Sequence, residues 1–197
     1  MNGVVVRGIA TLVVLVGLAQ IAQPLLVAAL IPPWRAVIET LEPDFRVVEL
    51  RAPAMQAEPL IELVVTPART IIVGTRAIVP EGSERAAAAM SRGAAWLAFT
   101  VFLVTLIAWP VSRPAREWPL RIVLGLPLLA ALLLVDVPIS LLGPLRSLIA
   151  GIGPGDSDAW IVGSRFLRGG GRTLVATAGA AFVCLVANTL TSAKHEP

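Results

Sequence analysis

Long stretches without any charged residue dominate the pattern of hydrophobic and polar positions along this chain. Four such runs occur, and Asp136 is the only interruption within them: residues 8–34, 93–112, 122–145 and 173–193. A helix of about 20 apolar residues crosses the ~30 Å hydrocarbon core of a bilayer. The pattern therefore predicts four transmembrane helices, over residues 9–31, over a second run that ends at Trp109-Pro110, over residues 122–145 and from Arg172 onward.

Residues 34–92 form the main polar segment, with seven Arg against eight Asp and Glu. A short helix is expected over residues 34–41, after Pro32-Pro33 ends the first long helix. Apolar and β-branched runs separated by Pro and Gly then predict three short strands, at residues 45–50, 60–66 and 70–79. Ser83 is the expected N-cap of the second long helix, and residues 86–89 lead into it.

The predicted fold class is a membrane α-helical protein with four transmembrane helices and a small β-rich extracytoplasmic domain between helices 1 and 2. Residues 1–33 are the N-terminal, signal-anchor-like helix, and cleavage after Ala29 is a minor alternative. Residues 34–92 are the outer domain, and residues 93–197 hold three further helices with a basic inner loop and an amphipathic outer loop. A sheet of this size is not stable alone, so it is expected to rest on the membrane, a loop or another protein.

Charge placement indicates how the chain is oriented. The formal net charge is +3, and fifteen of the sixteen basic residues are Arg, most of them at the ends of apolar runs. This placement is typical of membrane anchoring and not of nucleic-acid binding. The short loop over residues 111–121 carries three Arg, which places it and both termini in the cytoplasm and residues 34–92 in the periplasm. The tendency of basic residues to lie in cytoplasmic loops is not obeyed everywhere. With this orientation, Arg146 and the Arg residues before the last helix lie on the periplasmic side as well.

Residues that could support catalysis are sparse and scattered. Cys184 is the single cysteine and lies within an apolar run, while His195 and Lys194, the single histidine and lysine, are close to the C-terminus. No Cys–His or Ser–Lys pair is expected, and no cluster has metal-ligand spacing. We therefore expect neither an enzyme nor a bound metal or cofactor.

Asp136, in the stretch LLLVDVPISLL, is the carboxylate placed within an apolar span. Such residues usually face a partner or water, so an ion pair, a contact to a partner and proton transfer all remain open. Gly153-Pro154-Gly155-Asp156 matches the letters of the Gly-x-Gly-Asp motif of intramembrane aspartyl proteases, and Asp136 with Asp156 would form the acid pair of such a hydrolase. A capped turn that starts an amphipathic segment at residues 158–167 explains the same letters.

A cluster of arginines and glycines precedes the last apolar run: Arg165, Arg168, Gly169, Gly170, Gly171 and Arg172. A nucleotide-binding loop would need a Lys that is missing here. The glycines are interpreted as a break between an interfacial helix and the last transmembrane helix. The same geometry would make an anion site for a lipid phosphate, for a partner's carboxylate or for Asp136.

Ala108-Trp109-Pro110, LLLVDVPISLL and FLRGGGRTL together resemble the exosortase H-associated membrane proteins of bacteria. The resemblance implies a multipass protein of the bacterial inner membrane that is a partner of an exosortase. Because the chain lacks a cysteine at an outer membrane face, we expect a non-catalytic accessory or scaffold, with Asp136, Arg165, Arg168 and Arg172 as the interaction centre. Its partners would be that enzyme and membrane lipids. A subunit for lipid or polysaccharide transport is a further alternative.

Overall fold

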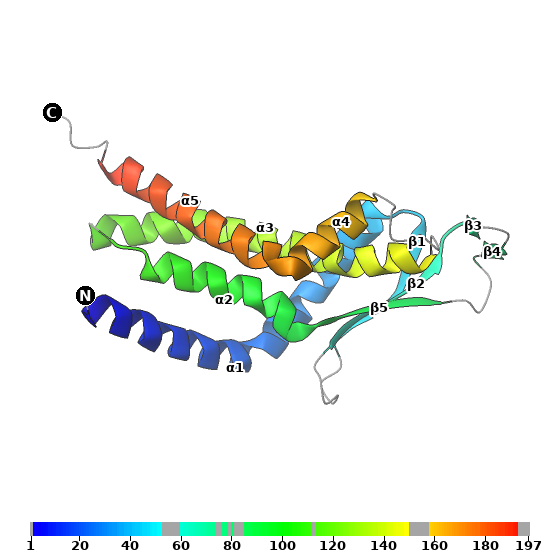
Figure 1. Ribbon diagram of the computed structural model, residues 1–197, viewed down its shortest axis with the longest axis horizontal. Helices are drawn as coiled ribbons and strands as arrows, with labels where there is room; N and C mark the ends of the chain where they lie inside the picture. The colour runs from blue at the N-terminus through cyan, green and yellow to red at the C-terminus, as the bar shows by residue number, and fades with distance from the viewer. Residues whose placement is uncertain are drawn as a thin grey trace. The chain divides into compact units, whose positions relative to one another are not determined.

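The computed structural model describes residues 2–52, 60–73, 76–78, 80, 85–111, 113–149 and 158–192 (Figure 1). The chain divides into two compact units, which we call the helical unit and the sheet unit. The helical unit comprises residues 1–23, 96–133 and 171–197, and the sheet unit comprises residues 24–95 and 134–170. Helices α1, α2 and α3 contribute residues to both units.

Helix α1 spans Asn2–Leu41 and contains three prolines, Pro24, Pro32 and Pro33. The prediction that Pro32-Pro33 ends the first helix is therefore wrong. A proline within a helix costs about 3 kcal/mol. Burial of a large apolar side chain contributes about 1.5–3 kcal/mol, and Trp34 and Ile38, one turn apart after the prolines, are each only 1% exposed. Tertiary packing thus offsets the local cost and keeps this part of the chain helical.

The sheet unit contains a three-stranded antiparallel sheet in the order β1-β2-β5. Strands β1 (Phe45–Arg51) and β2 (Leu60–Pro67) agree with the predicted runs. The third strand, β5 (Ala86–Ser91), lies where the start of a helix was expected, and helix α2 begins only at Arg92. That expectation is wrong because β5 pairs with β2 over six consecutive residues, a long-range contact that overrides the helix preference of alanine. The predicted cap at Ser83 lies outside the described residues.

Residues 70–79, expected as a single strand, instead hold two short strands. Strand β3 (Ile71–Val73) pairs antiparallel with β4 (Arg76–Ile78) in a sheet of its own. Three residues per strand is at the lower limit of strand length, which fits a hairpin separate from the main sheet.

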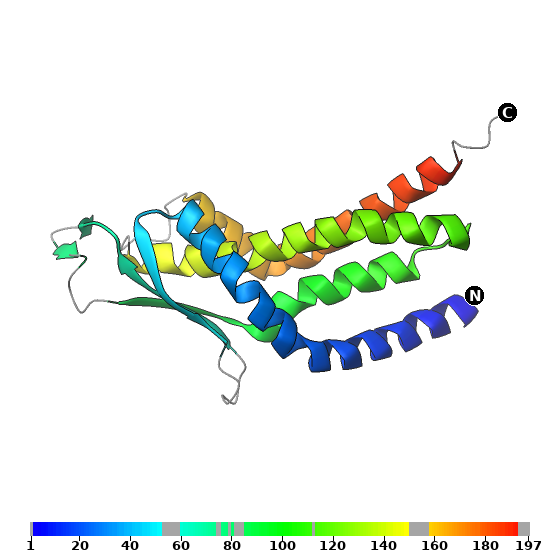
Figure 2. The same ribbon diagram turned by 180° about the vertical axis from the view of Figure 1, so that it is seen from behind.

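One face of the β1-β2-β5 sheet is covered by helices of the same unit, as both views show (Figures 1 and 2). Strand β2 alternates strictly, so that Ile61, Leu63 and Val65 are fully buried while the residues between them lie on the other face. These buried side chains form one core with residues of α1 and of α3 (Pro114–Ile149). The two helices contribute Trp34, Ile38, Val137, Leu141, Leu142 and Leu145 to this core. Helices α1 and α3 thus provide the support that a sheet of this size needs.

The helical unit packs α2 (Arg92–Ala108) with parts of α3 and of α5 (Arg172–Ser192). Two glycines lie at the contacts between these helices: a Cβ at Gly125 would lie 3.4 Å from Leu106, and one at Gly179 would lie 3.5 Å from Phe102, which are ordinary packing distances. Helix α3 starts at Pro114, a favoured residue for a first helical turn. The basic loop is accordingly shorter than predicted, and Arg116 and Arg121 belong to the helix.

Among the residues that the structure describes, three helical segments are long and apolar enough to cross a membrane. They are Gln23–Leu41, Pro114–Ser147 and Ala159–Ser192, while the apolar helix Arg92–Ala108 is shorter. Pro138, which was expected to bend or end its helix, does not end it, because α3 continues to Ile149. The structure thus supports a membrane protein with a small sheet.

Candidate functional site

The amphipathic segment predicted before the last helix is present as α4 (Ala159–Phe166). Asp158 caps it: its backbone is extended, and its carboxylate accepts a hydrogen bond from the Trp160 amide at 2.9 Å. This confirms the capped turn. Asp156, the second acid of the hydrolase hypothesis, lies outside the described residues, as does the rest of the Gly-x-Gly-Asp stretch.

The glycine cluster interrupts the helix between α4 and α5, as the sequence predicts. Residues Leu167–Gly171 form a short irregular turn in which Gly170 has a φ of 105°. Only glycine adopts this backbone conformation without strain. No atom lies within 4 Å of the position that a Cβ would take at Gly169 or Gly170. Gly170 is therefore required by the backbone itself and not by crowding around it.

Helix α3 meets α4 and the turn after it at a contact that we call the α3–α4 seam. The seam is formed by Ser140, Gly143, Trp160, Ser164 and Arg168. The Arg168 Nη2 donates to the carbonyl oxygen of Ser140 at 3.4 Å. A Cβ at Gly143 would overlap the side chain of Ser164 and would lie 2.8 Å from the carbonyl oxygen of Trp160. The two helices therefore touch backbone to backbone at this point, which fixes how α4 is held.

The predicted site residues divide between the two units. Asp136 is buried on α3 of the sheet unit, one turn before Ser140, and it engages in polar interactions. Arg165, Arg168 and Gly169 are exposed in the same unit. Gly171 and Arg172, both buried, belong to the helical unit. The pairing of Asp136 with an Arg before the last helix stays a prediction.

The outward side of α4 combines apolar and basic residues. Val162 and Phe166 are each about half exposed, and Arg165 lies between them and is exposed as well. Ile161 and Ser164, by contrast, are buried. We call the exposed set, with Arg168, the basic α4 face: Val162, Arg165, Phe166 and Arg168. Such a mixture suits contact with a carboxylate or phosphate set in an apolar surface.

A second charged cluster in the sheet unit was not foreseen. The guanidinium of Arg146, near the end of α3, contacts the Glu42 carboxylate through Nε at 3.1 Å and through Nη2 at 2.7 Å and 2.5 Å. Its Nη1 lies 3.6 Å from the Asp158 carboxylate. Glu42 is fully buried at the end of α1, so the cluster links α1, α3 and the cap of α4. Residues 42 and 146 are 104 positions apart, and no local pattern connects them.

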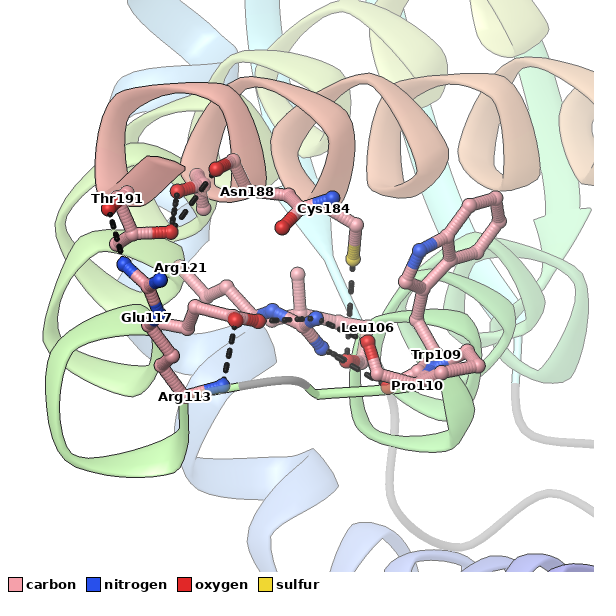
Figure 3. Close-up of polar contacts among 10 residues, drawn as sticks. Leu106, Trp109, Pro110, Arg113, Glu117, Arg121, Cys184, Asn188 and Thr191 are labelled. Carbon is pink, nitrogen blue, oxygen red and sulfur yellow. Dashed lines mark hydrogen bonds and ion pairs between the residues drawn. The ribbon is translucent and has the colours of Figure 1, made fainter. Parts of the chain in front are cut away.

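A buried ion pair in the helical unit was also missed (Figure 3). Arg121 is 0% exposed and Glu117 is 1% exposed, and their side chains meet at 3.1 Å. Arg121 also donates to the carbonyl oxygens of Leu106 and Trp109 at 3.1 Å and of Pro110 at 2.8 Å. Its guanidinium lies 5.7 Å from the ring centroid of Trp118. The spacing of four residues between Glu117 and Arg121 is a signal from which this pair could have been predicted.

Arg121 completes the end of α2. In a continuing helix the carbonyl of Leu106 would accept from the amide of residue 110, but that residue is proline and has no N–H. The Arg121 side chain supplies the missing donor. On the same side of the unit, Arg113 donates its backbone amide to Glu117 at 2.7 Å and its Nη1 to the carbonyl of Thr191 at 2.9 Å. These charges hold α2, α3 and α5 together.

Chemical groups for catalysis are not assembled in the part of the chain that the structure describes. No three His, Cys, Asp or Glu residues lie close enough there to hold a metal ion. Cys184 is buried in α5, with its Sγ 4.0 Å from the carbonyl of Leu106. Among known proteins, no family model, curated sequence or solved structure matches the chain.

Proposed function

We propose that this chain is a non-catalytic accessory or scaffold protein of an exosortase-type sorting system in the bacterial inner membrane. One observation carries the proposal, namely the basic α4 face. Arg165 is exposed on α4, which is held by the Asp158 cap and by the contact between Gly143 and Ser164, and Arg168 is exposed in the turn that follows α4. Charged groups on a fixed helix lose little freedom on binding, which favours a specific contact with a partner.

The charged residues that contact one another across elements support a structural role for this chain. Arg146 joins Glu42 and Asp158 across three elements, and Arg121 joins Glu117 and the end of α2. Each guanidinium is engaged with acceptors of the chain itself, so it helps to hold the helices in place. The basic α4 face, which lies within the sheet unit, is the surface that we propose for contact with the partner.

The proposed membrane arrangement has four spans, with both termini in the cytoplasm and the sheet in the periplasm. Helix α2 has 17 residues, which is the lower limit for crossing a bilayer, and it carries no charged residue after Arg92. Its C-terminal end meets the short basic loop at Arg113, as expected for a cytoplasmic turn.

A second candidate function is a subunit for lipid or polysaccharide transport. Half-exposed Val162 and Phe166 flank exposed Arg165, and this combination is also typical of helices that lie at the surface of anionic membranes. Under this alternative the arginines bind a lipid phosphate in place of a protein carboxylate.

Co-purification with the exosortase of the same cells tests the proposal. We expect the double variant Arg165→Gln/Arg168→Gln of the tagged full-length chain to lose the enzyme. The matched variant Arg116→Gln, which changes an exposed arginine of α3 in the helical unit, should retain it. A wild-type chain that never co-purifies with an exosortase would refute the proposal. A double variant that keeps the enzyme but loses bound phosphatidylglycerol in native mass spectrometry would establish the lipid alternative.

A further inference from the structure

The two edges of the β1-β2-β5 sheet differ in their chemistry. Strand β1 carries Arg46, Glu49 and Arg51, and its register with β2 shifts between Val47 and Glu49, which indicates a bulge. Strand β5 has the sequence AAAAMS, and its register with β2 runs without interruption from Ala86 to Ser91. Only β1 therefore has the features that normally protect a sheet edge.

An unprotected edge strand presents a row of backbone donors and acceptors to any extended chain. Proteins block such edges with charged residues, proline, bulges or very short strands. Strand β5 has six residues, none of which is charged or proline. In the part of the chain that the structure describes, it pairs with β2 alone. The geometry of β5 therefore permits the addition of a fourth strand.

A second copy of this chain is a poor fourth strand. If two β5 strands paired antiparallel around their centre, Ala86 would lie opposite Ser91 of the other copy. One step further, Arg85 of each copy would then lie beside Arg92 of the other, where α2 begins. The N-terminus of a helix carries a partial positive charge, which disfavours a second positive charge nearby. The exposed Arg85 thus favours a different polypeptide, one that places an acidic residue beside it.

The open face of the sheet defines what the side chains of such a segment would meet. Ala87 and Ala89 are exposed and add only methyl groups to the surface. Their partners on β2 are Val64 and Glu62, which are partly exposed on the same face. A β-branched residue beside Ala87 can therefore extend over the alanine toward Val64, and cross-strand pairs of this kind stabilise a sheet.

We propose that β5 binds an extended segment of a partner protein as a fourth strand, with an acidic residue of that segment beside Arg85 and β-branched residues along Ala87 and Ala89. Backbone hydrogen bonds along β5 supply the affinity, as in other complexes formed by strand addition. The charge of Arg85 determines the direction in which the bound segment runs along β5. The inference goes beyond the function proposed above, on which it rests only for the existence of a protein partner. It concerns a surface different from the basic α4 face.

The test uses the full-length protein in lipid nanodiscs and a synthetic peptide, acetyl-Glu-Thr-Val-Thr-Val-Thr-Val-amide. Amide hydrogen exchange of residues 86–91 should slow by about tenfold or more with the peptide, because new hydrogen bonds protect these amides. The amides of β1 serve as the internal control and should not change. A peptide with the same sequence that is N-methylated at every residue lacks the donors and should have no effect.

A charge exchange tests the position beside Arg85, whose exposed side chain can be changed without loss of packing. The variant Arg85→Glu should bind the Glu-headed peptide more weakly and should prefer the same peptide with Lys in place of Glu. Equal protection by the N-methylated peptide, protection of β1 in place of β5, or no change in preference in the variant would each overturn the inference. Protection without peptide that rises with protein concentration would instead identify a second copy as the fourth strand. Failure of exosortase co-purification would leave these peptide results unaffected.

Discussion

Replacement of Arg121 by methionine should be among the most destabilising single changes in the helical unit. Methionine keeps most of the apolar length of the side chain but removes four hydrogen bonds, three to carbonyl oxygens near the end of α2 and one to Glu117. It also leaves the carboxylate of Glu117, which is 1% exposed, without its buried cationic partner. The substitution therefore removes hydrogen bonds both from the C-terminal end of α2 and from the carboxylate of Glu117.

The expected loss follows from the burial of both partners. Removal of one member of a buried ion pair typically costs about 3–5 kcal/mol, because the remaining charge is uncompensated. Unsatisfied carbonyl oxygens cost about 1–3 kcal/mol each, but these contributions overlap and do not add. We therefore expect a loss of about 4 kcal/mol in the free energy of unfolding, a large part of the 5–15 kcal/mol typical of a folded domain.

Reversible unfolding of the purified protein in mixed micelles, followed by circular dichroism, would measure this loss. The control is Arg116→Met, which removes an exposed arginine from the same helix and should cost less than about 0.5 kcal/mol. The variant Glu117→Gln, combined with Arg121→Met, should cost less than the sum of the two single changes by about 2 kcal/mol. A loss for Arg121→Met no greater than that of the control, or strict additivity in the double variant, would refute the argument.

Two glycines of the connection between α3, α4 and α5 give further predictions by the same assay. Gly143→Ala should destabilise by about 1–3 kcal/mol, because the new methyl group would overlap Ser164 at a backbone contact. Gly170→Ala should cost about 1–2 kcal/mol because its φ of 105° is strained for any other residue. Gly169→Ala, which meets no atom within 4 Å, is the control for both and should cost at most a few tenths of a kcal/mol. Equal stability of all three variants would contradict both arguments.

Local signals in the sequence predict the elements that local chemistry decides. Asp158 caps α4 because a short acidic side chain before an apolar helix can accept a backbone hydrogen bond, and this depends only on neighbouring residues. The alternation along β2 and the break at Gly170 are local in the same sense. For these features the pattern of residue types was sufficient.

Features decided by distant contacts were not predictable from the pattern. The alanines of β5 have the strongest intrinsic preference for a helix, yet pairing with β2 makes them a strand. Pro32 and Pro33 should end a helix, yet the burial of Trp34 maintains it.

The candidate site shows the same division between local and distant signals. Arg165 and Arg168 of the basic α4 face could be singled out because they belong to a cluster of arginines and glycines that follows an amphipathic segment and precedes the last apolar run. The contact between Glu42 and Arg146 could not be recognised, because the two residues are 104 positions apart and neither lies in a motif. A single sequence does not show which distant charges meet, since their pairing depends on how the helices pack.

The direct junction between β5 and α2 restricts where a partner can be anchored. Ser91 is the last residue of the strand and Arg92 is the first of the helix, so no flexible linker separates them. At a rise of about 3.3 Å per residue, the middle of β5 near Ala88 lies about 13 Å along the chain from the start of α2. If α2 crosses the membrane as proposed, the middle of a segment bound to β5 is therefore within about 13 Å, along the chain, of the start of that membrane helix. The number of residues between that segment and the partner's own membrane helix then becomes a selection criterion, and insertions or deletions there should discriminate partners as strongly as changes in the segment itself.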